Sequence, residues 1–300
     1  MQSQEFSKGV AGTIRRVAFV PARYGLRPDR IVRRLRRMIS LADRWGLDAT
    51  IPVTASALDR HPGIVTSLSG VDLAIHGYNH VSYADLTIEE QNADIAGAKA
   101  AFIRHGVQTT GFRAPYLRLH PATYAILRSN GFVYDSSLPD LFLPESDPAY
   151  QSVSSLSGMR YANFRSLTRR ADAATASLIE FPVALPDDEI LVDGLGIRRS
   201  STLSRILGTM VEHAARSGRH LVLQIHPERF DFFSDALNLV LQKASDDGAW
   251  KASLAQASAW AISRGGQPGN WPNGSPYALS LTGDLDAVSL ADFVARVWVD

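Results

Sequence analysis

Short apolar runs alternate with longer amphipathic stretches along the chain, and this alternation predicts an α/β fold with mainly parallel strands. The apolar runs predict strands at residues 16–20, 49–54, 71–75, 109–112, 132–134, 178–183, 220–225 and 277–282. The amphipathic stretches predict helices at residues 28–45, 88–105, 121–130, 202–217, 235–247, 250–263 and 289–297. A capping-box pattern, Thr87 followed by Glu90, opens the second of these helices, and Gly106 follows its end.

Two stretches interrupt the alternation. Residues 138–174 are rich in Pro, Ser and Asp, and we expect them to form a long irregular insertion on the substrate side. Residues 264–276 have the Gly, Pro and Asn content of a linker. The chain is therefore expected to divide into an α/β domain over residues 1–263, a linker over 264–276, and a final strand and helix within 277–300.

Composition narrows the classes of function. Hydrophobic residues make up 45% of the 300 positions, enough for a buried core, and the 31 Lys and Arg nearly balance the 30 Asp and Glu, which argues against a nucleic-acid-binding surface. The chain has no cysteine, so disulfides, thiolate nucleophiles and iron–sulfur clusters are excluded, and a metal must be held by histidine or carboxylate. We find no export signal or membrane span and expect a cytoplasmic protein without membrane contact.

Five arginines crowd the polar face of the first predicted helix: Arg30, Arg33, Arg34, Arg36 and Arg37. They could form an anion-binding or partner surface. Because the chain as a whole is nearly neutral, we favour a solvated outer face.

Polar residues follow the ends of five predicted strands. These residues are His76, Arg113, Asp135, His226 and the Asp284/Asp286 pair. In parallel α/β sheets and barrels, ligands bind at the carboxyl ends of the strands. A structural role would explain any one of these residues, but the set predicts a functional site on one rim.

Each motif also has an alternative interpretation. His76 and His80 have the four-residue spacing that suits a divalent metal, although such pairs also arise by chance. Arg113, next to a proline-stiffened turn, could hold a carboxylate or form a structural salt bridge. His226 could be a general acid or a half-buried hydrogen-bonded side chain. The acidic loop at residues 186–189 could bind substrate, and we favour a solvated loop.

These motifs resemble those of the polysaccharide deacetylases (carbohydrate esterase family 4). HGYNH at 76–80 is similar to the family's H-[ST]-x-x-H metal motif, FRAPY at 112–116 to R-x-P-Y, YDSS at 134–137 to an Asp-containing segment, and LQIHP at 223–227 to the last histidine motif. The resemblance implies a distorted (β/α) barrel that hydrolyses acetamido groups of sugars with zinc or a similar divalent cation. Relatives in the wider superfamily open cyclic amides, some of them without metal.

The family's first strand should end in T-F-D-D, but residues 17–24 contain no carboxylate. The stretch ending in Thr282, Gly283, Asp284, Leu285 and Asp286 resembles the missing motif in its T-F-D-x-D variant. We therefore predict a circularly permuted order, in which the last strand inserts beside the first and completes the site. The alternative is a simple polar turn. A separation above about 10 Å between the Asp284 carboxylate and His76 would refute the hypothesis, because a metal and its ligands lie near 2 Å apart.

The resemblance and the strand ends together give each residue an expected role. His76, His80 and Asp286 are expected to hold a divalent metal, most simply zinc. Asp284 would be the general base, oriented by Arg113, and His226 would protonate the leaving amine. The backbone N–H of Tyr116 would stabilise the oxyanion, as the resemblance implies, and Asp135 would orient His226 or another site residue.

The expected activity is removal of the acetyl group from an N-acetylated sugar or polysaccharide. Two other classes stay open: an inactive carbohydrate-binding relative and a metal-independent cyclic-amide hydrolase. A homo-oligomer is also open, because a linker could let the last strand complete the site of a neighbouring chain.

Overall fold

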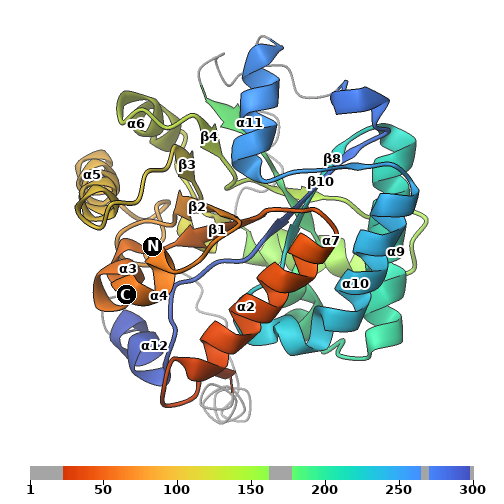
Figure 1. Cartoon of the computed structure of the whole chain (residues 1–300), viewed down its shortest axis with the longest axis horizontal. Coiled ribbons are helices and arrows are strands. Elements are labelled where there is room, and N and C mark those ends of the chain that lie inside the picture. Colours follow the sequence, from red (N-terminus) through yellow and green to blue (C-terminus); the bar gives the residue numbers. More distant parts are fainter. Residues whose placement is uncertain (1–22, 162–177, 265–269, 298–300) are drawn as a thin grey trace.

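The computed structural model describes residues 23–161, 178–264 and 270–297. Its main sheet is parallel throughout and has the order β6 (Ile179–Glu180), β4 (Tyr134–Asp135), β3 (Gly111–Phe112), β2 (Val71–Ile75), β1 (Ala49–Val53), β10 (Ala278–Thr282) and β8 (His220–Gln224), with β9 (Trp250–Lys251) paired to β10. A second parallel pair joins β5 (Pro139–Leu141) to β7 (Val183–Leu185), and β7 lies beside β8. The strands curl into a half-barrel with helices outside it, so the predicted (β/α) barrel is confirmed (Figure 1).

Helices surround the sheet. They are α2 (Asp29–Arg44), α3 (Ala55–Arg60), α4 (Pro62–Thr66), α5 (Ile88–Arg104), α6 (Thr123–Ser129), α7 (Tyr150–Arg160), α9 (Ser200–Ser217), α10 (Phe230–Asp246), α11 (Leu254–Ser263) and α12 (Leu290–Val297). Figure 1 shows α5 and α6 on one side of the strands and α9 and α10 on the other. Within the part of the chain that the structure describes, no helix has the length and apolarity needed to cross a membrane.

Local sequence explains how α5 begins and how α2 packs against the sheet. The capping box predicted for α5 is present, because Glu90 N–H donates to Thr87 Oγ1 at 3.2 Å and Thr87 N–H donates to Glu90 Oε2 at 2.8 Å. On α2, the residues Ile31, Leu35 and Met38 recur at helical spacing and are fully buried. Burial of such a stripe holds the helix against the sheet.

The last strand, β10, lies in the interior of the sheet between β1 and β8. All five of its residues are buried, three of them apolar and two of them, Ser280 and Thr282, with hydroxyl groups, as suits a strand covered on both faces. Its pairing with β8 runs from Ala278 opposite His220 to Thr282 opposite Gln224. The contact with β1 is shorter, because Pro52 has no N–H and can only accept a hydrogen bond, from Leu285 N–H at 2.8 Å.

Directly after β10 the backbone passes very close to its neighbours at Gly283. A Cβ at this position would lie 2.6 Å from the Ile225 carbonyl oxygen and 2.7 Å from Met38 Cε. No other residue type could be accommodated without moving the strand that carries Asp284.

Four predictions about secondary structure need correction. The predicted strand at 178–183 is interrupted, because Pro182 cannot donate to a ladder, and becomes β6 and β7. Residues 250–251 form β9 instead of the start of a helix, and the Ser253–Gln256 capping box then opens α11. The helix predicted from 235 already begins at Phe230. The insertion expected to be irregular contains β5 and α7. The predicted strand at 16–20 lies outside the described residues.

Candidate active site

The carboxyl ends of β2, β3, β8 and β10 meet at one rim, over a cavity of about 1290 Å³. Its lining includes His80, Tyr116, Gln224, His226, Asp284 and Asp286. The structure therefore brings together residues that lie up to 206 positions apart in the sequence, from His80 to Asp286. Three of the predicted residues, His76, Arg113 and Asp135, are absent from this lining and are fully buried.

Asp284 stands at the centre of the site. Arg113 Nη1 donates to its Oδ1 at 2.9 Å, and Gln224 Nε2 donates to its Oδ2 at 3.0 Å. His76 Nε2 lies 3.6 Å and His226 Nε2 3.8 Å from the same Oδ2, so the His76 distance is well inside the limit set by the permutation hypothesis. Burial alone would raise the pKa of Asp284, but the charge and hydrogen bond of Arg113, together with the neighbouring His76 and His226, hold the pKa below its ordinary value, so the group is a carboxylate.

Arg113 is itself fixed by several acceptors. Its Nε donates to the Ser136 carbonyl at 2.8 Å, its Nη2 to Ser136 Oγ at 2.7 Å, and its Nη1 to Thr282 Oγ1 at 2.7 Å as well as to Asp284. A fully buried guanidinium with this many partners has one orientation. Arg113 therefore fixes the position of the Asp284 carboxylate.

The loop that carries the two histidines depends on Gly77. This residue has φ +74°, and a Cβ would lie 3.0 Å from Tyr83 Oη and 3.2 Å from Asp94 Oδ1. Asp94 Oδ1 also accepts the Tyr78 N–H at 2.8 Å, which closes the turn after β2. Glycine in place of the family's usual Ser or Thr is thus explained by a left-handed, crowded position.

His76 presents an unprotonated nitrogen to Asp284. Its Nδ1–H donates to the Arg113 carbonyl at 2.8 Å, which leaves a lone pair on Nε2. Burial lowers the pKa of His76 to about 4, so the ring is neutral at pH 7. Nε2 is buried and has no hydrogen-bond partner. Two acceptors, this nitrogen and the Asp284 carboxylate, thus face one another.

His80 and Asp286 form the second pair. His80 Nε2 lies 3.5 Å from Asp286 Oδ2, and the Tyr116 ring packs edge-on against the imidazole with 4.3 Å between centroids. Burial, and then the charge of Arg296, hold the pKa of His80 well below its ordinary value. Tyr116 has φ 59°, a conformation rare outside glycine, at the position where the resemblance expects an oxyanion-binding N–H.

The proposed metal ligands were tested against this geometry. Two ligands near 2.05 Å from a tetrahedral ion lie about 3.3 Å apart, close to the observed 3.5 Å between His80 and Asp286. The neutral imidazoles and the carboxylate are also the donor types that zinc takes. In the described ranges, however, no three His, Asp or Glu side chains are already arranged to hold a metal ion. His76, His80 and Asp286 fit a metal in donor type, and His80 and Asp286 also fit in their separation, but the three side chains are not arranged as a preassembled set of ligands.

His226 is held by a residue that the sequence analysis assigned to a solvated loop. Asp188 Oδ1 lies 2.8 Å from His226 Nδ1, and Oδ2 accepts the His226 N–H at 2.8 Å. Asp187 and Asp188 are 3% and 1% exposed, so the prediction of a solvated acidic loop is wrong. Burial would lower the pKa of His226, but the Asp188 charge and hydrogen bond raise it to about 9, so the ring is an imidazolium at pH 7.

Asp135 does not take the role of orienting His226, which belongs to Asp188. It accepts a hydrogen bond from Ser137 Oγ and lies beside the Glu180 carboxyl in the interior. Burial, and then the Asp135 charge, raise the pKa of Glu180 well above its ordinary value, so this pair retains a proton. Asp135 is therefore part of the wall behind Arg113.

Three residues of the site were missed by the sequence analysis: Asp188, Gln224 and Arg296. For Gln224 a signal existed, because residues two apart on a strand share one face, and Gln224 precedes His226 by two. Asp188 follows β7, a strand that the sequence analysis merged with β6. Nine residues, which include most of α12, lie between Asp286 and Arg296, and the position of Arg296 beside Asp286 could be found only from the fold.

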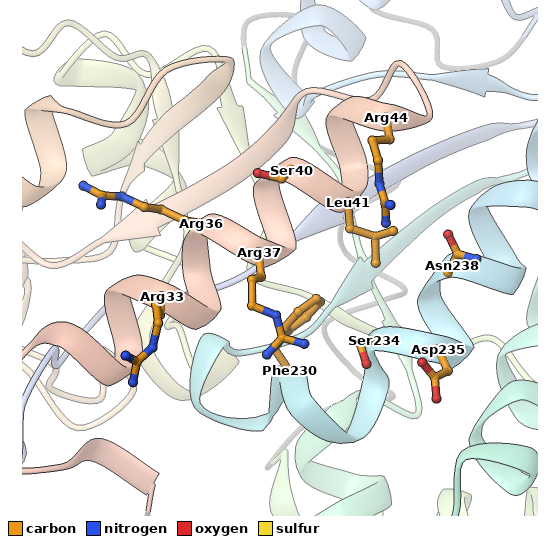
Figure 2. A pocket seen from close by; sticks show the side chains of 10 residues that line it. All are labelled: Arg33, Arg36, Arg37, Ser40, Leu41, Arg44, Phe230, Ser234, Asp235 and Asn238. Atoms are coloured by element: carbon orange, nitrogen blue, oxygen red, sulfur yellow. The ribbon is translucent and has the colours of Figure 1, made fainter.

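A second cavity, of about 690 Å³, lies on the outer face between α2 and α10 (Figure 2). The arginine-rich face of α2 borders it, and Arg33, Arg36, Arg37 and Arg44 extend from the helix there. Of the five arginines predicted to form a solvated face, Arg30, Arg33, Arg36 and Arg37 are exposed, whereas Arg34 is half-buried and donates to Asp231 at 2.7 Å. Arg37 pairs with Asp231 at 2.8 Å. None of the residues that line this groove also lines the strand-end cavity.

Comparisons with known proteins bear on the family resemblance and on the fold. The family pattern described as Polysaccharide deacetylase matches residues 29–134. The Peptidoglycan deacetylase-like protein FGM2 of Gibberella zeae is 29% identical over an alignment of 108 residues, and the match covers 34% of this chain and 32% of that protein's length.

Solved structures share the fold. A chain of Mycobacterium smegmatis described as a polysaccharide deacetylase has a TM-score of 0.63 at 21% identity, covering 88% of this chain and 87% of its own. A polysaccharide deacetylase-type chain of Pseudomonas aeruginosa PAO1 has a TM-score of 0.60 at 18% identity, covering 78% and 74%. The Puue allantoinase has a TM-score of 0.59 at 16% identity with the same coverage.

The curled parallel sheet and the strand-end histidines, arginine and carboxylates define a (β/α) barrel of the NodB type. Within that class, the family match and the curated relative confirm the resemblance to the polysaccharide deacetylases.

Proposed function

We propose that the protein is a deacetylase that hydrolyses the acetamido group of an N-acetylated sugar or polysaccharide. The observation that carries the proposal is the Asp284 carboxylate, held by Arg113 and flanked by the imidazoles of His76 and His226. A carboxylate and an imidazolium that line one cavity are the base and the acid that amide hydrolysis requires.

Each of the site residues has a separate role in the proposed amide hydrolysis. Asp284 accepts a proton from the attacking water, and Arg113 keeps the carboxylate ionised and correctly oriented. His226, charged because of Asp188, donates its Nε2 proton to the amine as the C–N bond breaks. The backbone N–H of Tyr116 is proposed to stabilise the oxyanion, in the turn that its positive φ creates.

His76, His80 and Asp286 are the residues proposed to hold a divalent metal, most simply zinc. When bound, such a cation polarises the amide carbonyl and favours ionisation of water. The permuted strand order is likewise our proposal. It is supported by the position of β10, which brings Asp284 and Asp286 to the histidine loop within the same chain.

Acetate release from a panel of N-acetylated sugars, measured with and without a chelator, tests the activity. We expect release by the wild type, loss on chelation, and a decrease of about 10²–10⁴-fold in Asp284→Asn, the range for a general base. Asp85→Asn is the matched control, because Asp85 lines the same cavity without contacting the base. Full activity in Asp284→Asn would exclude Asp284 as the base, and release that persists with chelator would favour a metal-independent amide hydrolase.

A further inference from the structure

Helix α12 returns the chain across the rim of the site. The Asp292 carboxylate on this helix lies 2.9 Å from His61 Nε2 and 3.1 Å from Arg60 Nε; Arg60 ends α3, and His61 joins α3 to α4. Ser289 Oγ donates to the same carboxylate at 2.9 Å, and Leu290 N–H donates to the Gly25 carbonyl at 2.8 Å. These contacts fix the start of α12 next to the loop that carries Asp286.

The last turn of α12 places a cation on Asp286. Arg296 Nη1 forms an ion pair with Asp286 Oδ2, and the guanidinium carbon lies 4.9 Å from the centre of the Phe293 ring one turn earlier. Phe293 in turn packs against Tyr24, with 5.0 Å between ring centroids. The Arg296 and Asp286 side chains are 15% and 9% exposed, so the pair is largely shielded from water.

The same carboxylate oxygen faces His80. Asp286 Oδ2 lies 3.5 Å from His80 Nε2, a separation that suits two ligands of one metal ion. The positively charged Arg296 guanidinium thus contacts the same Asp286 oxygen that would bind the metal. A divalent cation and a guanidinium cannot both lie against this oxygen, since like charges repel strongly where water is excluded.

From this geometry we propose that Arg296 competes with the divalent metal for Asp286, so that α12 controls metal loading of the site. The proposal rests on the metal-dependent function proposed above. In the metal-loaded protein, Arg296 turns away from Asp286 into the cavity, and the last turn of α12 loses its ionic anchor. Arg296 is therefore a residue that sets metal affinity, and it has no role in proton transfer.

Isothermal titration of the full chain with zinc tests the competition directly. We expect Arg296→Gln to bind zinc at least about tenfold more tightly than the wild type, and Arg296→Lys, which keeps the charge, to stay closer to the wild type. Arg198→Gln is the matched control, because Arg198 lines the same cavity and is expected to leave zinc affinity unchanged. In the wild type, zinc should also speed hydrogen exchange in residues 293–296.

An unchanged or weaker zinc affinity in Arg296→Gln would overturn the proposal, and so would a complete lack of zinc binding by both proteins. The acetate-release assay separates this inference from the function itself. If acetate release is sensitive to chelator but zinc affinity is the same in Arg296→Gln and the wild type, only the proposed competition is refuted. If Arg296→Gln binds zinc more tightly but no acetate is released by the wild type, the competition is supported and the proposed deacetylase activity is refuted.

Discussion

Asp188→Asn tests whether the buried acidic loop sets the charge of the proposed general acid. Asp188 Oδ1 lies 2.8 Å from His226 Nδ1 and raises the pKa of His226 to about 9 against the opposing effect of burial. Without this charge, burial remains, and the pKa should fall below the ordinary value of 6.5. At pH 8 the protonated fraction would then fall from about 0.9 to about 0.03, so the rate should drop roughly thirtyfold.

The pH dependence of acetate release measures this effect. The wild type should lose activity as pH rises through about 9, where His226 loses its proton, and in Asp188→Asn the loss should begin below pH 7. NMR titration of the His226 ring checks the same shift without substrate. Asp187→Asn is the control, because the Asp187 carboxylate binds the Tyr161 hydroxyl at 2.6 Å and the Ile190 N–H at 2.8 Å instead. An unmoved alkaline limb in Asp188→Asn would refute the reasoning.

The free energy of unfolding should also depend on the protonation of His226. The folded state raises the pKa of His226, so the stabilisation is fully present below about pH 6.5 and is lost as pH rises through about 9. Its size is on the order of 3 kcal/mol, and urea unfolding across this range should show the decline in the wild type but not in Asp188→Asn.

Three further predictions concern the fold. Gly283→Ala should lower the free energy of unfolding by about 1–3 kcal/mol in urea titrations, because the new Cβ meets the Ile225 carbonyl, whereas Gly208→Ala on α9, where a Cβ meets nothing, should be neutral or stabilising. Deletion of residues 277–300 should abolish cooperative unfolding, since β10 is an interior strand; a sharp transition would contradict this. Thr87→Ala should cost about 1 kcal/mol through loss of the α5 capping box, and an unchanged midpoint would show that the box contributes little.

Much of the fold could be predicted because its signals are local. Each of the apolar runs at β1, β2, β8 and β10, and the capping box of α5, is contained in a few consecutive residues. The structure confirms these elements. The errors in predicted secondary structure occur where a segment's conformation depends on pairing with a segment distant in sequence. Residues 250–251 form a strand by pairing with Ala278 and Leu279, the part of β10 that β1 does not pair with.

The site shows the same division. His76, Arg113, His226 and Asp284 stand directly after strands, and parallel pairing alone brings them to one rim. The environment of the acidic loop could not be predicted in this way. An Asp next to another Asp and a Glu has the composition of a solvated turn, and only packing against β8 buries Asp188 beside an imidazole.

The position of β10 also bears on how the protein is made. Residues 278–282 leave the ribosome after every other strand of the described sheet, yet they fill the gap between β1 and β8. Until then, the nascent chain presents two unpaired strand edges and a buried Arg113 without its carboxylate partner. Partly synthesised chains should therefore be open to aggregation and inactive. Completion of the described sheet and assembly of the site would then be a single step that waits for the synthesis of β10.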